Sequence, residues 1–183
     1  MVTYKITLEQ IEQAEEDAKY LGMAHAKSKV IKLISNRDVI GSLGQQIVHK
    51  WLQDMGVDHL YSPPYSPSIA STKKNGDYYD IAILSDDMIY KYIDVKSFSS
   101  FCSEKTELHV LKYLRDKELD YLFVHIEKGY SEAKIIGGIK WRDFWTNGHE
   151  AREESRFKDQ LKIDSYFVYP NELTDPLLFI KQK

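Results

Sequence analysis

Hydrophobic and polar residues alternate along the stretch from Gly76 to Ser97, and this alternation predicts two short β-strands joined by a tight turn at 85–87. Successive side chains of a strand point to opposite faces of its sheet. The hydrophobic positions therefore share one face, which we expect to be buried. They are Ile81, Ile83, Ile93 and Val95.

Two acids and a lysine occupy the opposite face of this predicted hairpin. A turn centred on Asp87 places Asp80 directly across from Asp94, where the Cβ atoms of paired residues lie about 4.5–5.5 Å apart. Two carboxylates at that separation raise one another's pKa, and a divalent cation between them removes the repulsion. Lys96 follows two residues after Asp94 on the same face. The pattern predicts a metal site with an ammonium group beside it.

Helical spacing of hydrophobic residues predicts helices over 8–21 and 38–55, with a second helical segment after Gly22. The helix over 38–55 carries one broad hydrophobic stripe, and Gly56 ends it. Gln45 lies at the edge of that stripe. The other expected elements are a loop over 61–76, a helix over 104–117, strands over 121–127, 134–141 and 165–170, and a charged helix or loop over 148–162.

The order of these elements indicates the fold class. A strand, a crossover helix and a second strand imply a parallel pair of strands. Together with the antiparallel hairpin, this predicts a mixed sheet with helices on at least one side, an α/β or α+β fold. At 183 residues the chain suits one globular unit, in which we distinguish a helical extension over 1–37 from a main domain over 38–183.

Composition narrows the function only moderately. The formal charge of −3 argues against a protein that coats nucleic acid along its whole surface, yet it permits a local basic face. No hydrophobic run approaches the ~20 residues that span a membrane. The one cysteine, Cys102, cannot form an internal disulfide, which fits the reducing cytoplasm.

Outside the hairpin, titratable residues form no familiar catalytic or metal-binding pattern. The six histidines lack the paired spacing of a zinc site, and we interpret His125 as a core residue of its strand. His109 and Lys105 belong to the expected helix after the Lys96 strand, so we expect them near the site without a direct part in the chemistry. The acidic face of the first helix is interpreted as solvated surface; it consists of Glu12, Glu15, Glu16 and Asp17.

The order of the acids, the lysine and the preceding helix resembles the PD-(D/E)XK nuclease superfamily of restriction-endonuclease-like proteins. The matching residues are Asp80 in YDIAIL and both Asp94 and Lys96 in YIDVKS. Upstream, GSLGQQIVHKWLQDMG resembles the first core helix of that family. The chain departs from the family pattern at Tyr79, where a proline is usual, and at Gln45, where an acid is commoner.

This resemblance covers roughly residues 38–140 and implies a nuclease-like core, a central mixed sheet flanked by helices, with additional N-terminal helices. The metal ligands that it implies for Mg²⁺, with Mn²⁺ as a substitute, are the carboxylates of Asp80 and Asp94 and the backbone carbonyl of Val95. Lys96 would orient or activate the attacking water, and Gln45 could hold a water at the metal. The implied activity is metal-dependent endonuclease cleavage of phosphodiester bonds, with DNA as the expected substrate.

Several lysines near the hairpin and in the second helical segment are candidate contacts for nucleic-acid phosphates, although each also fits plain solvated surface. They are Lys29, Lys32, Lys73 and Lys74. Two other function classes stay open. The first is an inactive nuclease fold that binds nucleic acid or a protein partner, which Gln45 permits. The second is a protein–protein module, which the net charge permits. A homodimer is an open alternative for the oligomeric state.

Overall fold

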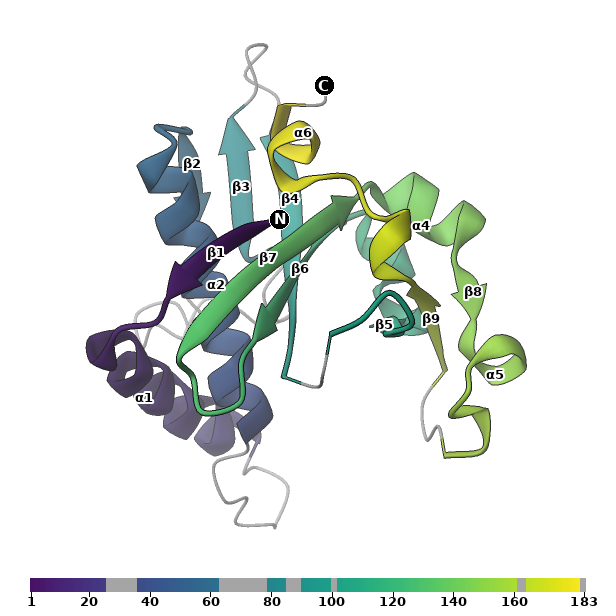
Figure 1. Ribbon diagram of the computed structural model, residues 1–183, viewed down its shortest axis with the longest axis horizontal. Coiled ribbons are helices and arrows are strands. Elements are labelled where there is room, and N and C mark those ends of the chain that lie inside the picture. The colour runs from purple at the N-terminus through teal and green to yellow at the C-terminus, as the bar shows by residue number, and fades with distance from the viewer. Residues whose placement is uncertain (26–35, 63–78, 85–89, 100–101, 161–163, 182–183) are drawn as a thin grey trace.

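The protein is described from a computed structural model, which places residues 1–25, 36–62, 79–84, 90–99, 102–160 and 164–181. A six-stranded sheet forms its centre, in the order β1-β7-β6-β4-β3-β2 (Figure 1). β4 and β6 run parallel, and the other neighbouring pairs are antiparallel, so the predicted mixed sheet is confirmed. Its strands are β1 (Val2–Lys5), β2 (His59–Tyr61), β3 (Ile81–Leu84), β4 (Tyr90–Phe98), β6 (Asp120–Ile126) and β7 (Glu132–Ile139).

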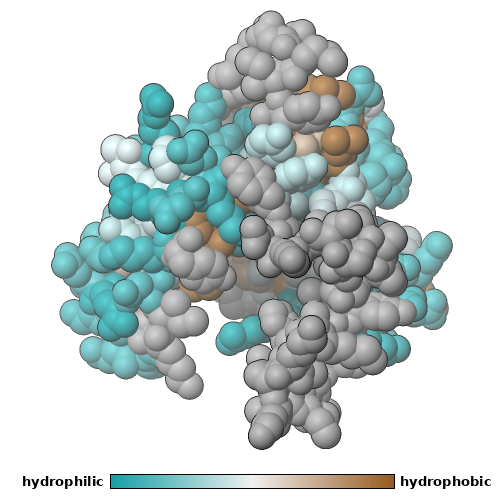
Figure 2. Space-filling model, turned by 180° about the vertical axis from the view of Figure 1, so that it is seen from behind, coloured by the Kyte–Doolittle hydropathy of each residue, from teal (hydrophilic) through white to brown (hydrophobic). Residues whose placement is uncertain are grey.

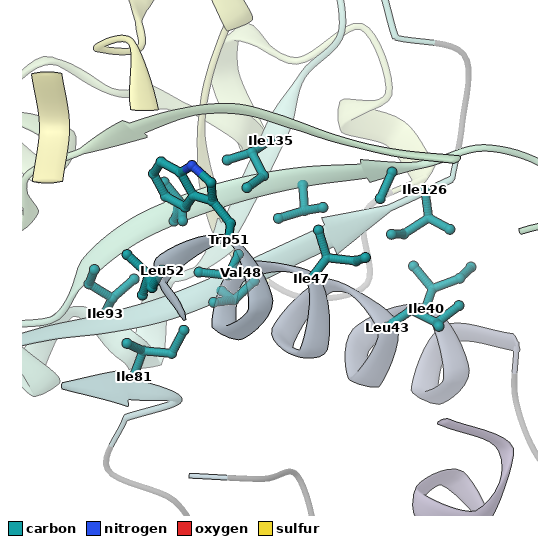
Figure 3. Packing of buried hydrophobic residues seen from close by; sticks show 14 of the residues in the cluster. Ile40, Leu43, Ile47, Val48, Trp51, Leu52, Ile81, Ile93, Ile126 and Ile135 are labelled. Atoms are coloured by element: carbon teal, nitrogen blue, oxygen red, sulfur yellow. The ribbon is translucent and has the colours of Figure 1, made fainter. Parts of the chain in front are cut away.

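Helix α2 (Asn36–Asp54) packs on one face of this sheet, and α1 (Leu8–His25) packs on α2. The hydrophobic stripe of α2 meets buried side chains of the strands (Figure 3). Each fully buried Leu or Ile contributes about 1.5–3 kcal/mol, so this layer is a principal source of stability. The four hydrophobic residues of the predicted hairpin all belong to it, which confirms their burial: Ile81, Ile83, Ile93 and Val95.

A glycine brings α2 unusually close to the sheet. A Cβ atom added at Gly44 would lie 1.8 Å from Ser97 Oγ of β4, well inside contact distance. A Cβ added at Gly41 would meet nothing within 4 Å. The close approach therefore depends on Gly44 alone, and it brings the following residue, Gln45, toward β3 and β4.

A second, three-stranded sheet packs against the other face of the central sheet, in the order β5-β9-β8 (Figure 1). Its hydrophobic residues and those of α4 form a second core with Tyr121 and Phe123 of β6. The additional elements are β5 (Leu108–Leu111), β8 (His149–Glu150), β9 (Ser165–Val168), α4 (Trp141–Asn147), α5 (Ala151–Glu154), α6 (Pro176–Lys181) and the 3₁₀-helices η1 (Lys112–Lys117), η2 (Lys158–Gln160) and η3 (Pro170–Glu172).

The prediction of a helix over 104–117 is wrong, because this segment contains β5 followed by η1. Leu108 and Val110 are buried while His109 between them is partly exposed, an alternation with the period of a strand. β5 pairs with β9, more than fifty residues later in the chain. The parallel pairing of β4 with β6 is nevertheless as predicted; only the nature of the crossover differs.

The N-terminal segment was predicted to be helical throughout, but it begins with a strand. β1 pairs with β7 and forms one edge of the central sheet. The first helix also continues through Gly22 to His25, although a glycine inside a helix costs about 1 kcal/mol. Ala14 and Ala18 of α1 lie in the main core, so this segment shares the core of the rest of the chain.

The described surface seen from behind is mainly hydrophilic, with hydrophobic residues in small areas (Figure 2). Large hydrophobic side chains that are at least half exposed include Leu60 and Leu178. No helix in the described part of the chain is long and apolar enough to cross a membrane.

Candidate active site

Asp80 directly precedes β3 and Asp94 lies in the middle of β4, so the two acids come from neighbouring antiparallel strands. The register pairs Ile81 with Ile93, and the Asp80 N–H donates to the Ile93 carbonyl at 3.0 Å. The two carboxyl groups are close enough to form a hydrogen bond with each other. The predicted placement of Asp80 beside Asp94 is therefore confirmed.

Asp80 also accepts two hydrogen bonds that fix its orientation. Gln45 Nε2 donates to Oδ1 at 2.9 Å, and the Val95 N–H donates to Oδ2 at 2.7 Å. Burial, followed by the negative charge of Asp94, raises the pKa of Asp80 far above its ordinary value. The Val95 N–H and the Lys96 charge act in the opposite direction without cancelling this shift. In the absence of a cation, this raised pKa favours the protonated form of Asp80.

Lys96 lies on the same strand face as the acids. Its Nζ is 2.6 Å from Asp94 Oδ2, and 27% of the lysine side chain and 14% of the aspartate side chain remain exposed. The ammonium offsets part of the negative charge of the pair and still has a path to solvent. A phosphate group that approached the two acids would meet this ammonium, which could donate charge-assisted hydrogen bonds to it.

Gln45 reaches the acid pair from α2, and its side-chain carbonyl is left with a free acceptor. Oε1 is buried, and no hydrogen-bond partner for it occurs among the described residues. Leaving a buried acceptor unpaired costs about 1–3 kcal/mol. Because Nε2 of the same amide is held by Asp80, a donor bound at Oε1 would lie next to the acids. A water molecule fits this requirement.

The donors gathered here suit a hard divalent cation. The carboxylates of Asp80 and Asp94 supply oxygen ligands, and the carbonyl of Val95 belongs to the residue whose N–H already contacts Asp80. Nowhere in the described ranges do three or more His, Cys, Asp or Glu side chains gather as a metal-binding group. Mg²⁺ accepts such a sparse site, since it keeps several waters and binds through one or two carboxylates. Zinc, which prefers His and Cys, does not match it.

Tyrosines surround the acids. The rings of Tyr79 and Tyr92 pack against each other, with their centroids 4.9 Å apart. Tyr61 pairs with Ile81 on the neighbouring strand, and burial together with the nearby charges of Asp17 and Asp80 raises the pKa of its phenol. The phenol of Tyr61 is therefore a neutral neighbour of the site at ordinary pH.

The prediction that Asp17 lies on a solvated surface is wrong, because only 5% of its surface is exposed. Ser42 Oγ of α2 donates to Asp17 Oδ2 at 2.5 Å, and Gln13 Nε2 donates to Oδ1 at 3.0 Å. These bonds compensate for burying the carboxylate. The position of Asp17 in the sequence could have indicated its burial, because it follows Ala14 by three residues and precedes Ala18 on the same helical face.

His109 lies near Lys96, as expected, although it comes from a strand and not from a helix. The two residues line a common pocket of about 230 Å³. Lys105 lines a different pocket, of about 400 Å³, together with Arg156. Glu107, which sequence reasoning missed, lies 3.2 Å from His109 Nε2 and is nearly inaccessible to solvent.

Of the remaining residues singled out in the sequence, some are described by the structure and others are not. His125 is buried, as expected, and lies one residue before the end of β6. The turn at 85–87 lies outside the described residues. So do the four candidate phosphate contacts, Lys29, Lys32, Lys73 and Lys74.

Comparison with known proteins adds no further constraint. No model of a protein family matches the chain, and a search of curated proteins found no matching sequence. The arrangement of Asp80, Asp94, Lys96 and Gln45 is thus the basis for a functional proposal.

Proposed function

We propose that this protein is a metal-dependent nuclease that hydrolyses phosphodiester bonds, with DNA as the expected substrate. The observation that supports the proposal is the placement of Asp80 beside Asp94 on neighbouring strands, with the Lys96 ammonium 2.6 Å from Asp94 Oδ2. Two acids held side by side at a partly exposed position favour binding of a cation, which replaces the proton that the raised pKa of Asp80 retains. An ammonium at the same position favours an anionic substrate.

The residues of the site have separable roles in this reaction. Asp80, Asp94 and the Val95 carbonyl would hold Mg²⁺, which would polarise the phosphate and lower the pKa of the attacking water. The Lys96 ammonium orients that water or stabilises the charge that develops on the phosphate oxygens. The Gln45 Oε1 atom, which has no partner among the described residues, would accept a hydrogen bond from a water and hold it beside the acids. Val95 N–H keeps Asp80 in place while these groups act.

A second candidate function is a nuclease fold that binds nucleic acid without cleaving it. Gln45 favours this candidate, because a neutral amide stands where an additional acid would strengthen the hold on a cation. We further propose a cytoplasmic location, with nucleic acid as the partner. Its phosphates would be contacted by Lys29, Lys32, Lys73 and Lys74. A homodimer acting on two strands is a further option, which sedimentation of the protein with and without DNA would test.

The decisive experiment combines metal binding with cleavage. Mg²⁺ and Mn²⁺ are titrated by calorimetry into wild-type protein and into Asp94→Asn, and plasmid, single-stranded DNA and RNA are incubated with each. We expect wild type to bind the metal and cleave, and Asp94→Asn to do neither while remaining folded. A wild-type protein that binds neither ion at millimolar concentration would end the nuclease proposal. Metal binding without cleavage of any substrate would favour the inactive binding protein.

A further inference from the structure

A pocket of about 230 Å³ opens beside Lys96, between the central sheet and β5. Its wall is partly hydrophobic, formed by Phe98, Leu108 and Phe123. Phe98 is half-buried, whereas Leu108 and Phe123 are almost fully buried. Lys96, whose ammonium contacts Asp94, also lines this pocket. The pocket is therefore connected to the acid pair through Lys96.

Glu107 and His109 of this pocket already have partners inside the protein, and the hydroxyl of Ser97, which also lines it, lies against Gly44 of α2. Glu107 Oε1 accepts from the N–H and Nε of Arg156 at 3.0 and 3.1 Å, and Oε2 accepts from Ser155 Oγ at 2.5 Å. His109 Nε2 lies 3.2 Å from Glu107 Oε2, and its Nδ1 lies 3.0 Å from Ser165 Oγ. With both carboxylate oxygens and both ring nitrogens engaged, Glu107 and His109 have little capacity left to bond a ligand.

What the pocket offers a ligand is therefore an aromatic and aliphatic surface next to one ammonium. A flat ring system joined to a phosphate matches both parts, the ring against Phe98 and the phosphate at Lys96. The volume lies below the roughly 300–1,000 Å³ of ordinary small-molecule sites, so the pocket suits one ring system and not a base pair. A base can enter such a pocket only when it is unpaired and unstacked.

We propose that this pocket holds a single unpaired nucleobase of the substrate, next to the phosphate at Lys96, and binds it by stacking and shape without reading its identity. This inference rests on the proposed nuclease function. It specifies the substrate class: nucleic acid that is single-stranded, or unpaired, beside the reacting phosphate. Fully paired duplex should be a poor substrate, and replacing one base by another at this position should matter little.

Wild-type protein tests the inference with a series of single-stranded oligonucleotides in which each base in turn is replaced by an abasic sugar. Affinity is measured with Ca²⁺ in place of Mg²⁺, and cleavage is measured separately with Mg²⁺. At one position, beside the cleaved bond, we expect base removal to weaken binding roughly five- to hundredfold, the range for loss of one stacked base. Exchange among the four bases there should change affinity less than about threefold, because stacking tolerates every base.

Two variants assign the effect to the pocket. Phe98→Ala should bind the intact and abasic strands equally, whereas Phe157→Ala, which removes an exposed aromatic ring that does not line the pocket, should keep the full difference. Thermal melting tests whether Phe98→Ala is folded. If it is not, Phe98→Leu takes its place, and we expect it to show a reduced difference in affinity between the intact and abasic strands. An undiminished difference in the folded Phe98 variant would overturn the inference.

The same measurements separate the inference from the function on which it rests. Cleavage that is indifferent to base removal at every position, or that requires fully paired duplex, overturns the pocket assignment and leaves the nuclease proposal standing. Binding with the expected abasic effect but no cleavage supports the pocket and contradicts the nuclease activity. No binding to any nucleic acid overturns both.

Discussion

Asp80 Oδ2 accepts a hydrogen bond from the Val95 N–H at 2.7 Å, so the residue proposed to offer its carbonyl to a metal already holds the first acid with its amide. The backbone of β4 thus orients Asp80, and the side chain of Asp94 on the same strand presses a second carboxyl group against it. The cost of this arrangement is electrostatic. It should be visible as a dependence of stability on pH and on divalent cations.

Stability of the metal-free protein should fall as pH rises above the ordinary carboxyl pKa. The pKa of Asp80 is raised in the folded state, so the folded state binds more protons than the unfolded chain above about pH 4. The stabilising contribution is complete below that pH and is lost as pH rises through the folded pKa. Each proton of difference contributes at most about 1.4 kcal/mol per pH unit. Mg²⁺ should therefore raise the melting temperature more at pH 8.5 than at pH 5.5.

Asp94→Asn is the matched comparison for this pH dependence, because it removes the neighbouring charge and keeps the shape of the side chain. Its metal-free melting temperature should fall less steeply with pH than that of wild type, and Mg²⁺ should have little effect on it. Calorimetric scans at several pH values measure both quantities. Parallel pH curves for the two proteins would contradict a strained acid pair.

Lys96→Ala should abolish cleavage with little change in stability. The ammonium is partly exposed and its pairing with Asp94 is accessible to solvent, so we expect the free energy of unfolding to change by less than about 1 kcal/mol. Mg²⁺ affinity should hold or rise slightly, since a positive charge next to a ligand is lost. Cleavage should fall by orders of magnitude, as for other groups that act in the transition state. The exposed Lys128, changed to Ala, serves as control, and equal activity of the two variants would remove Lys96 from the mechanism.

The two glycines of α2 should respond oppositely to alanine. Gly44→Ala places a methyl group against Ser97 Oγ and should destabilise the protein by about 1–3 kcal/mol, the usual cost of overpacking. Gly41→Ala meets no neighbour and should stabilise by up to about 1 kcal/mol, because alanine favours the helix. Urea unfolding measures both. Equal effects would mean that α2 does not depend on the close contact at Gly44.

These contrasts show which parts of the molecule its sequence could predict. The pairing of Asp80 with Asp94 was predictable, because the hairpin is local and the alternation of Ile81, Ile83 and Ile93 specifies which face is buried. β5 was not, because Leu108–Leu111 becomes a strand by pairing with β9, a distant segment. The burial of Asp17 likewise depends on a partner, Ser42, that another helix supplies. The periodicity of hydrophobic residues along the sequence contains no information about such non-local pairing.

Removing the charges of Lys29, Lys32, Lys73 and Lys74 together, by change to Ala, should weaken binding to DNA and reduce its dependence on salt. Each phosphate contact that is lost reduces the slope of log affinity against log salt by about 0.7–0.9. Filter binding at several salt concentrations gives the slope. A variant with four other exposed lysines changed to Ala, at Lys5, Lys19, Lys128 and Lys158, controls for the change in net charge. An unchanged slope in the fourfold variant would assign those lysines to ordinary surface.

Gln45→Glu should increase the affinity for Mg²⁺, because it introduces the acid that is commoner at this position of the nuclease pattern. The substitution replaces the donor that holds Asp80 Oδ1 with a third carboxylate, so the metal-free protein loses a hydrogen bond and gains a repulsion. We expect a loss of about 1–3 kcal/mol in the free energy of unfolding at pH 8 without metal. An added carboxylate near a divalent ion contributes more than 1 kcal/mol even at an effective dielectric constant of 20, so Mg²⁺ should bind roughly tenfold more tightly.

Gln46→Glu controls for the added charge in that experiment, because Gln46 donates to Ser42 and does not contact Asp80. Calorimetric titration with Mg²⁺ and cleavage of plasmid and of single-stranded DNA are measured for both variants and for wild type. If Gln45→Glu alone binds Mg²⁺ more tightly and cleaves faster, Gln45 limits an active nuclease. If tighter binding brings cleavage where wild type has none, the natural chain is the inactive binding protein. Equal Mg²⁺ affinity in all three proteins would show that Gln45 does not face the metal, and the site would then have to be built from Asp80, Asp94 and Val95 alone.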